Sequence, residues 1–114
     1  MQAEFLEQGE RLIATPQGRM EAADGRGFAA AVQQRLGAAI QSVTIDLEQL
    51  SFVNFGGIRA LLQLARSLKG GERSLDFVRG GDAVRDALDQ AGLDDFFPFT
   101  PPYISNRGNQ DETP

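Results

Sequence analysis

A strand that leads into a helix in the middle of the chain constrains the fold more than any other feature. Residues 42–47 (SVTIDL) alternate apolar and polar side chains, which is typical of a half-buried β-strand. An amphipathic helix follows, with Asn54 as N-cap and Gly70-Gly71 as a stop. Its apolar face consists of Ile58, Leu61, Leu62, Ala65 and Leu68. A further strand over residues 74–78 completes a strand–helix–strand unit, which predicts parallel pairing with a right-handed crossover.

The N-terminal part of the chain predicts a β-hairpin. Residues 3–6 (AEFL) are a short mixed segment that a strand could form, residues 11–14 (RLIA) are typical of a second short strand, and Gly9-Glu10 between them is typical of a turn. Pro16 and Gly18 interrupt the second segment, which favours an irregular strand or an edge strand.

Two further helices are predicted around the central unit. The first is expected from an Asp24 N-cap to about residue 39, and the last over residues 83–91, ended by Gly92. A short final strand is expected within residues 94–99. The resulting order, β-β-α-β-α-β-α with a final β, predicts an α/β domain with a mixed, mostly parallel sheet.

The amino-acid composition removes most catalytic machinery. The 114 residues, enough for one domain, contain no Cys and no His. This chain therefore supplies no disulfide, no thiolate or imidazole metal ligand, no Cys nucleophile and no Ser-His-Asp triad. Lys69 is the only lysine, so acid–base chemistry near neutral pH would depend on it and on carboxylates. We therefore expect a protein that is not an enzyme and holds neither metal nor cofactor.

The charge balance and the hydropathy bound the partners and the location. The formal net charge is −5, which opposes binding to phosphate backbones and to anionic lipid. No apolar run approaches the roughly 20 residues of a membrane span. The acidic start MQAEFLEQGE is unlike the basic and then apolar start of a signal peptide. We expect a cytoplasmic protein that neither inserts into a membrane nor binds nucleic acid.

The turn Asn54-Phe55-Gly56-Gly57, between the central strand and its helix, is the first candidate for a binding site. Backbone N–H groups at a helix N-terminus can receive an anion or the carboxylate of a partner, and glycines let another surface approach closely. The alternative is a tight turn with an N-cap and no ligand. The GxxxxGK[ST] spacing of a phosphate-binding loop is missing.

Three other groups of side chains have both a structural and a functional interpretation. A basic group is either a binding patch or a solvated helix face, and consists of Arg59, Arg66, Lys69 and Arg73. An acidic group favours a solubilising surface over a cation site, and consists of Asp82, Asp86, Asp89, Asp94 and Asp95. An aromatic group favours core closure over an interaction patch, and consists of Phe96, Phe97, Phe99 and Tyr103.

The segment from about Val43 to Phe99 resembles the STAS family, the domain of bacterial anti-sigma factor antagonists and of sulfate transporter tails. The family's hallmark is a strand that ends in an apolar-apolar-Asp-Ser-Ser-Gly-type turn and opens a helix, and residues 52–58 (FVNFGGI) hold that place. Residues 82–88 (DAVRDAL) with 91–93 (AGL) resemble the last major helix, and residues 18–21 (GRME) resemble the turn before the first helix. The resemblance implies a small mixed sheet with helices packed mainly on one side.

The resemblance also implies a site and a departure from the family's usual control. In the anti-sigma factor antagonists, the Ser or Thr after the Asp is phosphorylated by a kinase that is also the anti-sigma factor, and the unphosphorylated protein binds that kinase. Here Asn54 holds the Asp position and Phe55, which has no hydroxyl, holds the phosphoacceptor position. This degenerate position is therefore not phosphorylatable, and Phe55 is expected to be an exposed aromatic anchor. The implied partner-binding residues are Asn54, Phe55, Gly56, Gly57 and Arg59.

These implications lead to one main hypothesis and two alternatives. The main hypothesis is a bacterial, non-catalytic protein-binding module for partner switching in transcription regulation, with a histidine-kinase-like anti-sigma factor or another regulatory protein as partner. The first alternative is a STAS accessory subunit of an ABC-type phospholipid transport system, with the transporter ATPase as partner. The second is a sensor of a small ligand or nucleotide. The expected domain spans residues 1–102, and a polar, flexible tail is expected over residues 103–114.

Overall fold

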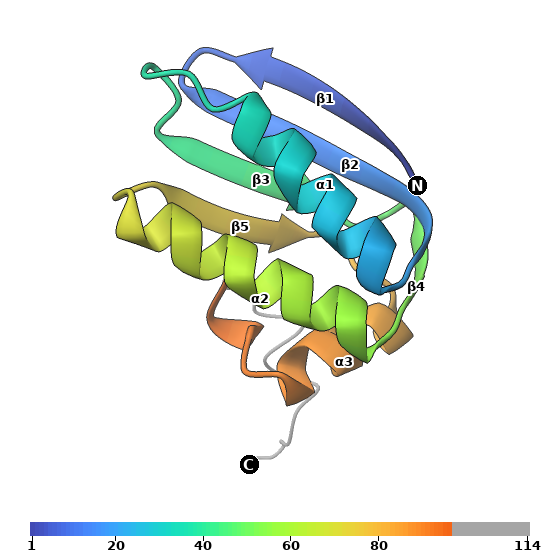
Figure 1. Ribbon diagram of the computed structural model, residues 1–114. Helices are drawn as coiled ribbons and strands as arrows, with labels where there is room; N and C mark the ends of the chain where they lie inside the picture. The colour runs from blue at the N-terminus through green and yellow to red at the C-terminus, as the bar shows by residue number, and fades with distance from the viewer. Residues whose placement is uncertain (97–114) are drawn as a thin grey trace.

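The computed structural model describes residues 1–96, which form one sheet and its covering helices (Figure 1). The strands are β1 (Gln2–Gln8), β2 (Arg11–Met20), β3 (Ser42–Asp46), β4 (Leu50–Val53) and β5 (Ser74–Val78). The helices are α1 (Ala22–Gln34), α2 (Phe55–Gly70) and α3 (Asp82–Gln90), followed by a 3-10 turn, η1 (Asp94–Phe96). The predicted domain end at residue 102 and the tail over 103–114 lie outside the described residues.

The sheet is mixed and mostly parallel, as predicted. Its order is β1-β2-β3-β5, and β4 pairs with the far end of β2. β1 and β2 form the predicted antiparallel hairpin, whereas all the other strand pairs are parallel. α1 and α2 lie side by side over one face of the sheet, and α3 packs near β4 (Figure 1). The predicted α/β class, with the helices mainly on one side, is confirmed.

β2 is an inner strand with an irregularity, which is the first of the two predicted alternatives. It runs through Pro16 and Gly18, with β1 on one side and β3 and β4 on the other. The ladder with β3 ends at Ala14, and the ladder with β4 begins at Gly18 and contains a register shift. Pro16, which has no N–H to donate, falls between these two ladders. Of the two predicted alternatives, the irregular strand is therefore the one observed, and the edge strand is not.

The start of α1 differs from the prediction. The N-cap is Glu21, and Asp24 is the third helical residue. The two residues form a capping box, in which the Asp24 carboxylate accepts a 3.0 Å hydrogen bond from the Glu21 N–H. This hydrogen bond and the Met1 amino group, 3.5 Å away, hold the pKa of Asp24 below its usual range. The helix ends at Gln34, ahead of Gly37, and so is shorter than predicted.

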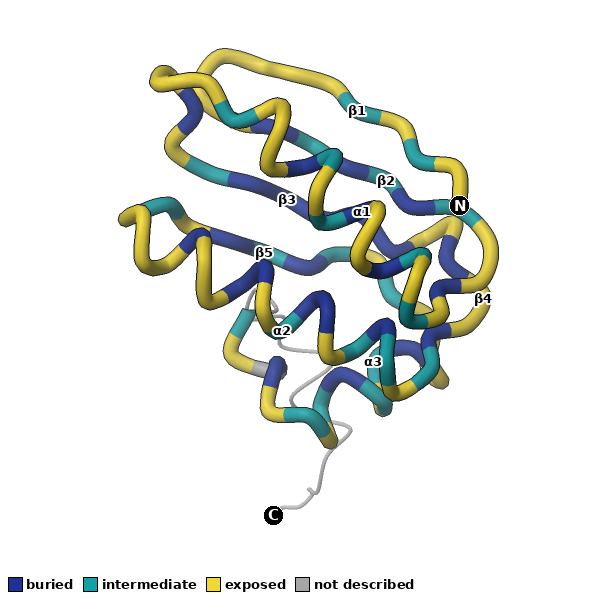
Figure 2. Tube along the Cα trace, in the orientation of Figure 1, coloured by how far each residue is buried: buried dark blue, intermediate teal, exposed yellow. Residues whose placement is uncertain are grey.

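α2 turns a slightly different face to the core than the sequence predicts. Ile58 and Leu62, both placed on the apolar face by their spacing, are only half-buried (Figure 2 shows the alternation along the helix). α2 packs against β4 and β5 and also against α1. The contact with α1 buries Ala60 and Leu64, in addition to the residues that face the sheet. The buried positions are Gly57, Ala60, Leu61, Leu64, Ala65 and Leu68.

The predicted final strand is wrong where the structure describes it. Asp94–Phe96 forms the 3-10 turn η1, and residues 97–99 lie outside the described part. Phe96 packs edge-on against the buried Phe77 of β5, with 6.3 Å between the ring centroids. Phe96 therefore helps to close the core, as the sequence favours. Within residues 1–96, no helix is long and apolar enough to cross a membrane.

Candidate functional site

The 54–57 turn is fixed at the N-terminus of α2 by hydrogen bonds that Asn54 accepts and donates. Its side-chain Oδ1 accepts a 2.8 Å hydrogen bond from the Gly57 N–H, which makes Asn54 the N-cap, as predicted. The Asn54 N–H donates to the Met20 carbonyl at 3.0 Å, and the Ile58 N–H donates to the Asn54 carbonyl at 2.9 Å. These bonds attach the start of α2 to the end of β2 and give the turn one defined conformation.

The two glycines of the turn are required by packing inside the domain. A Cβ added to Gly57 would lie 2.6 Å from the Met20 carbonyl oxygen, and one added to Gly56 would lie 2.6 Å from the Ala22 Cβ. Both distances are shorter than real contacts, so any side chain here would push the β2–α1 connection away. The glycines thus let the starts of α1 and α2 come together, in agreement with the tight-turn interpretation.

Phe55 is the most exposed large apolar side chain of the described residues. It is the first residue of α2, and 76% of its surface is accessible. The Arg59 guanidinium carbon, one helical turn further, lies 5.6 Å from the centre of its ring. The predicted exposure of Phe55 is therefore confirmed.

A second aromatic–arginine pair lies on the other side of the turn and was missed in the sequence. Arg19 of β2 and Phe52 of β4 are partners in the strand register, and the guanidinium carbon lies 4.1 Å from the ring centre. Phe52 is 37% exposed. The available signal was the spacing of Phe52 and Phe55, three residues apart across a turn.

The other predicted basic residues do not form one patch. Arg73 donates from Nε to the Ile40 carbonyl at 2.8 Å and from Nη2 to the Gly37 carbonyl at 3.2 Å, so it holds a loop. Arg66 and Lys69 are exposed on α2. Arg59 alone of the predicted basic group is next to the 54–57 turn.

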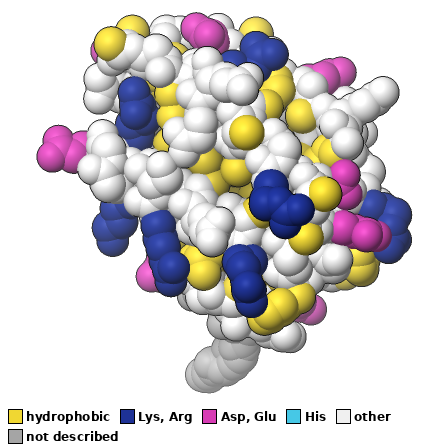
Figure 3. Space-filling model, in the orientation of Figure 1, with side chains coloured by type: hydrophobic (Ala, Val, Ile, Leu, Met, Phe, Trp, Pro, Cys, Tyr) yellow, Lys and Arg dark blue, Asp and Glu magenta, His cyan; other side chains and the backbone are white. Residues whose placement is uncertain are grey.

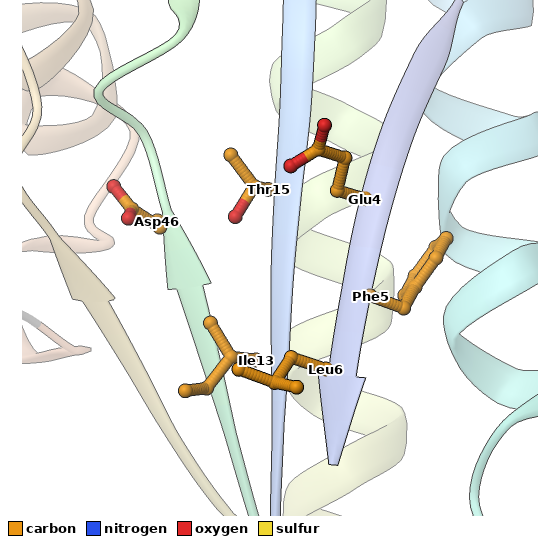
Figure 4. Close-up of a pocket in the computed structure, with 6 residues that line it drawn as sticks. All are labelled: Glu4, Phe5, Leu6, Ile13, Thr15 and Asp46. Carbon is orange, nitrogen blue, oxygen red and sulfur yellow. The ribbon is translucent and has the colours of Figure 1, made fainter.

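A hollow of about 590 Å³ lies on the face of the sheet opposite α1 and α2 (Figure 4). Leu6, Ile13 and Asp46 help to line it, whereas the Phe5 ring points the other way and stacks on Phe28 of α1. The Arg79 guanidinium hydrogen-bonds to the Asp46 carboxylate and holds its pKa below the usual range. An ion-paired carboxylate of lowered pKa is a weak general base. Within residues 1–96, no three acidic side chains gather in a way that would hold a metal ion.

The comparisons with known proteins agree with this architecture. A family model described as STAS domain matches residues 2–104. The structure resembles that of the anti-sigma factor antagonist SpoIIAA in its unphosphorylated form, with a TM-score of 0.73 and 16% identity over 98% of this chain and 100% of that chain. An anti-sigma factor antagonist from Mycobacterium paratuberculosis matches with a TM-score of 0.73 and 21% identity, over 88% of this chain and 85% of that chain.

A transport protein contains the same fold. The murine anion transporter Slc26a9 matches 79% of this chain with a TM-score of 0.67 and 20% identity, and the match covers 15% of the transporter. A sequence search of curated proteins finds no match. At these identities the structural likenesses establish the fold, while the family model covers most of the sequence. The chain belongs to the STAS domain family.

Proposed function

We propose that this STAS domain is a non-catalytic module that binds a regulatory protein through the 54–57 turn and the start of α2. The partner proposed is a histidine-kinase-like anti-sigma factor, in a bacterial cytoplasm, and the output is regulation of transcription. The observation that carries the proposal is the 76% exposure of Phe55 at the first position of α2. Burial of this ring in an interface would remove apolar surface from water, and aromatic and Arg side chains are enriched at the energetic centres of interfaces.

The residues of the turn divide into contact and positioning roles. Phe55 and Arg59 are exposed and make contact with the partner. Asn54 caps the helix, and Gly57 is buried beneath the turn, so both hold Phe55 in place. Gly56 does the same through its close approach to Ala22.

Binding at this turn is proposed to be free of phosphorylation control. Phe55 has no hydroxyl to accept a phosphate, and the neighbouring residues of the turn are Asn and Gly. A phosphate adds a charge of about −1.5 to −2, which disrupts an interface when it is placed at its centre. Without it, this surface stays competent to bind, and the amount of complex follows the amounts of the two proteins.

The test is affinity capture from the native host with three forms of the full chain. Wild type is expected to retain a histidine-kinase-like ATPase, and Phe55→Ser is expected to weaken that complex by about 1 kcal/mol or more. Arg66→Ala, an exposed change on the same helix, is the matched control and should retain the partner. Equal retention by Phe55→Ser would contradict docking at the turn. Capture of a transporter ATPase instead would favour the accessory subunit of a phospholipid transport system.

A further inference from the structure

The outer surface of α1 and α2 contains a continuous groove that starts at the 54–57 turn. Two adjoining hollows of about 260 Å³ and 290 Å³ form it, and they share Arg26 of α1 with Ala60 and Gln63 of α2. The first hollow reaches Gly56 and Arg59, and the second continues past Gln33 and Ser67, whose side chains are hydrogen-bonded at 2.8 Å. The groove is hollow because the residues at its base, where the two helices approach each other, are small. They are Ala22, Gly56 and Ala60.

The groove is basic in a protein that is acidic overall. Its described lining contains Arg26 and Arg59 and no carboxylate. α2 carries three basic residues and no acidic one, and the carboxylate of α1, Asp24, is engaged by the Glu21 N–H and the Met1 amino group. Figure 3 views this side of the molecule and shows Lys and Arg side chains across it, with Asp and Glu mainly near the outline. With a net charge of −5, the acidic residues are thus concentrated elsewhere.

Arg26 and Arg59 differ from the arginines that have structural partners. Arg11 lies 3.7 Å from the Asp76 carboxylate and Arg79 is bound to Asp46, so each is paired with a carboxylate of this chain. No ion pair joins Arg26 or Arg59 to a carboxylate within residues 1–96. Two guanidinium groups, one from each helix, therefore face a shared hollow without an internal counter-charge.

We propose that this α1–α2 groove binds an acidic segment of the partner protein, whose carboxylates pair with Arg26 and Arg59. Arg suits this role because its planar guanidinium can donate two hydrogen bonds to one carboxylate. The amides of Gln33 and Gln63 add polar partners along the groove, and the Ala floor admits side chains of an extended or helical segment. A protein segment fits a concave groove better than a flat lipid surface does. This inference rests on the proposed function, since the groove extends the surface that begins at Phe55.

The experiment follows the amide signals of the ¹⁵N-labelled full chain by NMR during titration with a synthetic peptide of alternating Glu and Ala at low salt. The expected shifts lie in α1 and in α2 as far as Ser67, and they shrink as NaCl is added. The double variant Arg26→Glu/Arg59→Glu should weaken binding about tenfold or more. Arg66→Glu/Lys69→Glu changes the net charge equally outside the groove lining and should weaken it less than about threefold.

Several results would overturn the proposal. They are an absence of shifts, shifts on another surface, equal weakening by the two double variants, or a response of α1 and α2 to phosphatidylglycerol vesicles but not to the peptide. Far-ultraviolet circular dichroism of each variant, compared with that of the wild type, checks that the fold is retained. The peptide titration needs no native partner, whereas the test of the 54–57 turn captures that partner with Phe55→Ser. A negative peptide titration would therefore overturn the groove proposal without deciding whether the 54–57 turn binds the partner. A negative partner capture would likewise leave the peptide titration as a valid test of the groove.

Discussion

Arg79 binds both carboxylate oxygens of Asp46 across the ends of two neighbouring parallel strands. Its Nε donates to Oδ1 at 3.2 Å and its Nη2 donates to Oδ2, while the Glu48 carboxylate lies 3.0 Å from the same Nη2. Arg79 adopts a φ of 60°, a left-handed conformation that few non-glycine residues take. The Asp46 side chain is only 12% exposed. The pair therefore fastens the loop after β5 to the end of β3, at a cost in backbone conformation.

This pair predicts a dependence of stability on pH. The Arg79 hydrogen bonds lower the pKa of Asp46 below 3.8 in the folded protein, so the stabilisation is complete above 3.8 and is lost as pH falls through the lowered value. Asp46→Asn should reduce the free energy of unfolding at neutral pH by about 1 kcal/mol, discounted because Arg79 is largely exposed. Urea denaturation of both proteins should show this difference shrinking in strong acid.

The control for that prediction is Asp76→Asn. Asp76 lies 3.7 Å from Arg11, and both side chains are more than a third exposed, so the change should be smaller than for Asp46→Asn. A loss in Asp46→Asn that stays constant down to strong acid would show that packing around residue 46, and not the charge of the carboxylate, stabilises the fold.

The cap of α2 gives a second prediction. Asn54→Ala removes the acceptor of the Gly57 N–H and should lower the free energy of unfolding by roughly 0.5–2 kcal/mol. Asn54→Asp keeps an acceptor of the same length, and its charge is favourable at a helix N-terminus, so it should retain the stability of wild type. Chemical denaturation of the three proteins measures both effects. Equal losses in the two variants would mean that the amide group of Asn54, and not its capping oxygen, is needed.

Two helical glycines should respond in opposite directions to the same substitution. Gly57→Ala places a Cβ 2.6 Å from the backbone oxygen of Met20 and should destabilise by about 1–3 kcal/mol, as overpacking does. Gly27→Ala, on the exposed side of α1 with no atom within 4 Å of the new Cβ, should stabilise by about 0.4–1 kcal/mol. Thermal unfolding of both variants tests the assignment. A neutral Gly57→Ala would show that the β2–α1 connection can shift.

The sequence predicted those parts of the fold whose determinants are local. The Asn54 cap, the alternation in β3 and the amphipathic α2 all depend on residues within one or two turns of each other. β4 was missed because four residues carry too little pattern, and its identity as a strand depends on pairing with the distant end of β2. The sequence favoured Asp24 as the N-cap because both positions of this particular capping box, Glu21 and Asp24, hold an acidic residue.

In the candidate site, too, the sequence predicted only what depends on neighbouring residues. The exposure of Phe55 could be predicted from its phase on α2, since it is out of register with the apolar stripe. The stacking of Arg19 on Phe52 and the groove between Arg26 and Arg59 join residues from different elements, so only the tertiary structure brings them together. The glycines of the turn were open to a binding or a packing role, and the distances to Met20 and Ala22 favour packing.

The observed face of α2 changes which leucine should matter most. Leu61 is fully buried, so Leu61→Ala should cost roughly 2–5 kcal/mol through lost contacts and a cavity. Leu62 was predicted to face the core but is half-buried, so Leu62→Ala should cost less, about 1–2 kcal/mol in proportion to the smaller area removed from the interior. Denaturant unfolding of the two variants gives the order directly. The reverse order would mean that α2 is rotated relative to this structure.

Phe55 and Ser51 together give a prediction about phosphorylation. Incubation with a kinase partner and ATP should leave the mass of the wild-type protein unchanged, because Phe55 has no hydroxyl and the Ser51 hydroxyl donates a 3.1 Å hydrogen bond to the Gly18 carbonyl on β2.

Asn54→Asp/Phe55→Ser places a hydroxyl on the exposed first residue of α2 beside an intact cap, and should gain the mass of one phosphate. Since residue 55 is exposed, this variant should unfold within about 0.5 kcal/mol of wild type. Ser51→Ala in the same background should leave the gain in place. A phosphate mapped to Ser51 in the wild-type protein would instead show that control by phosphorylation has moved to the strand side of the turn.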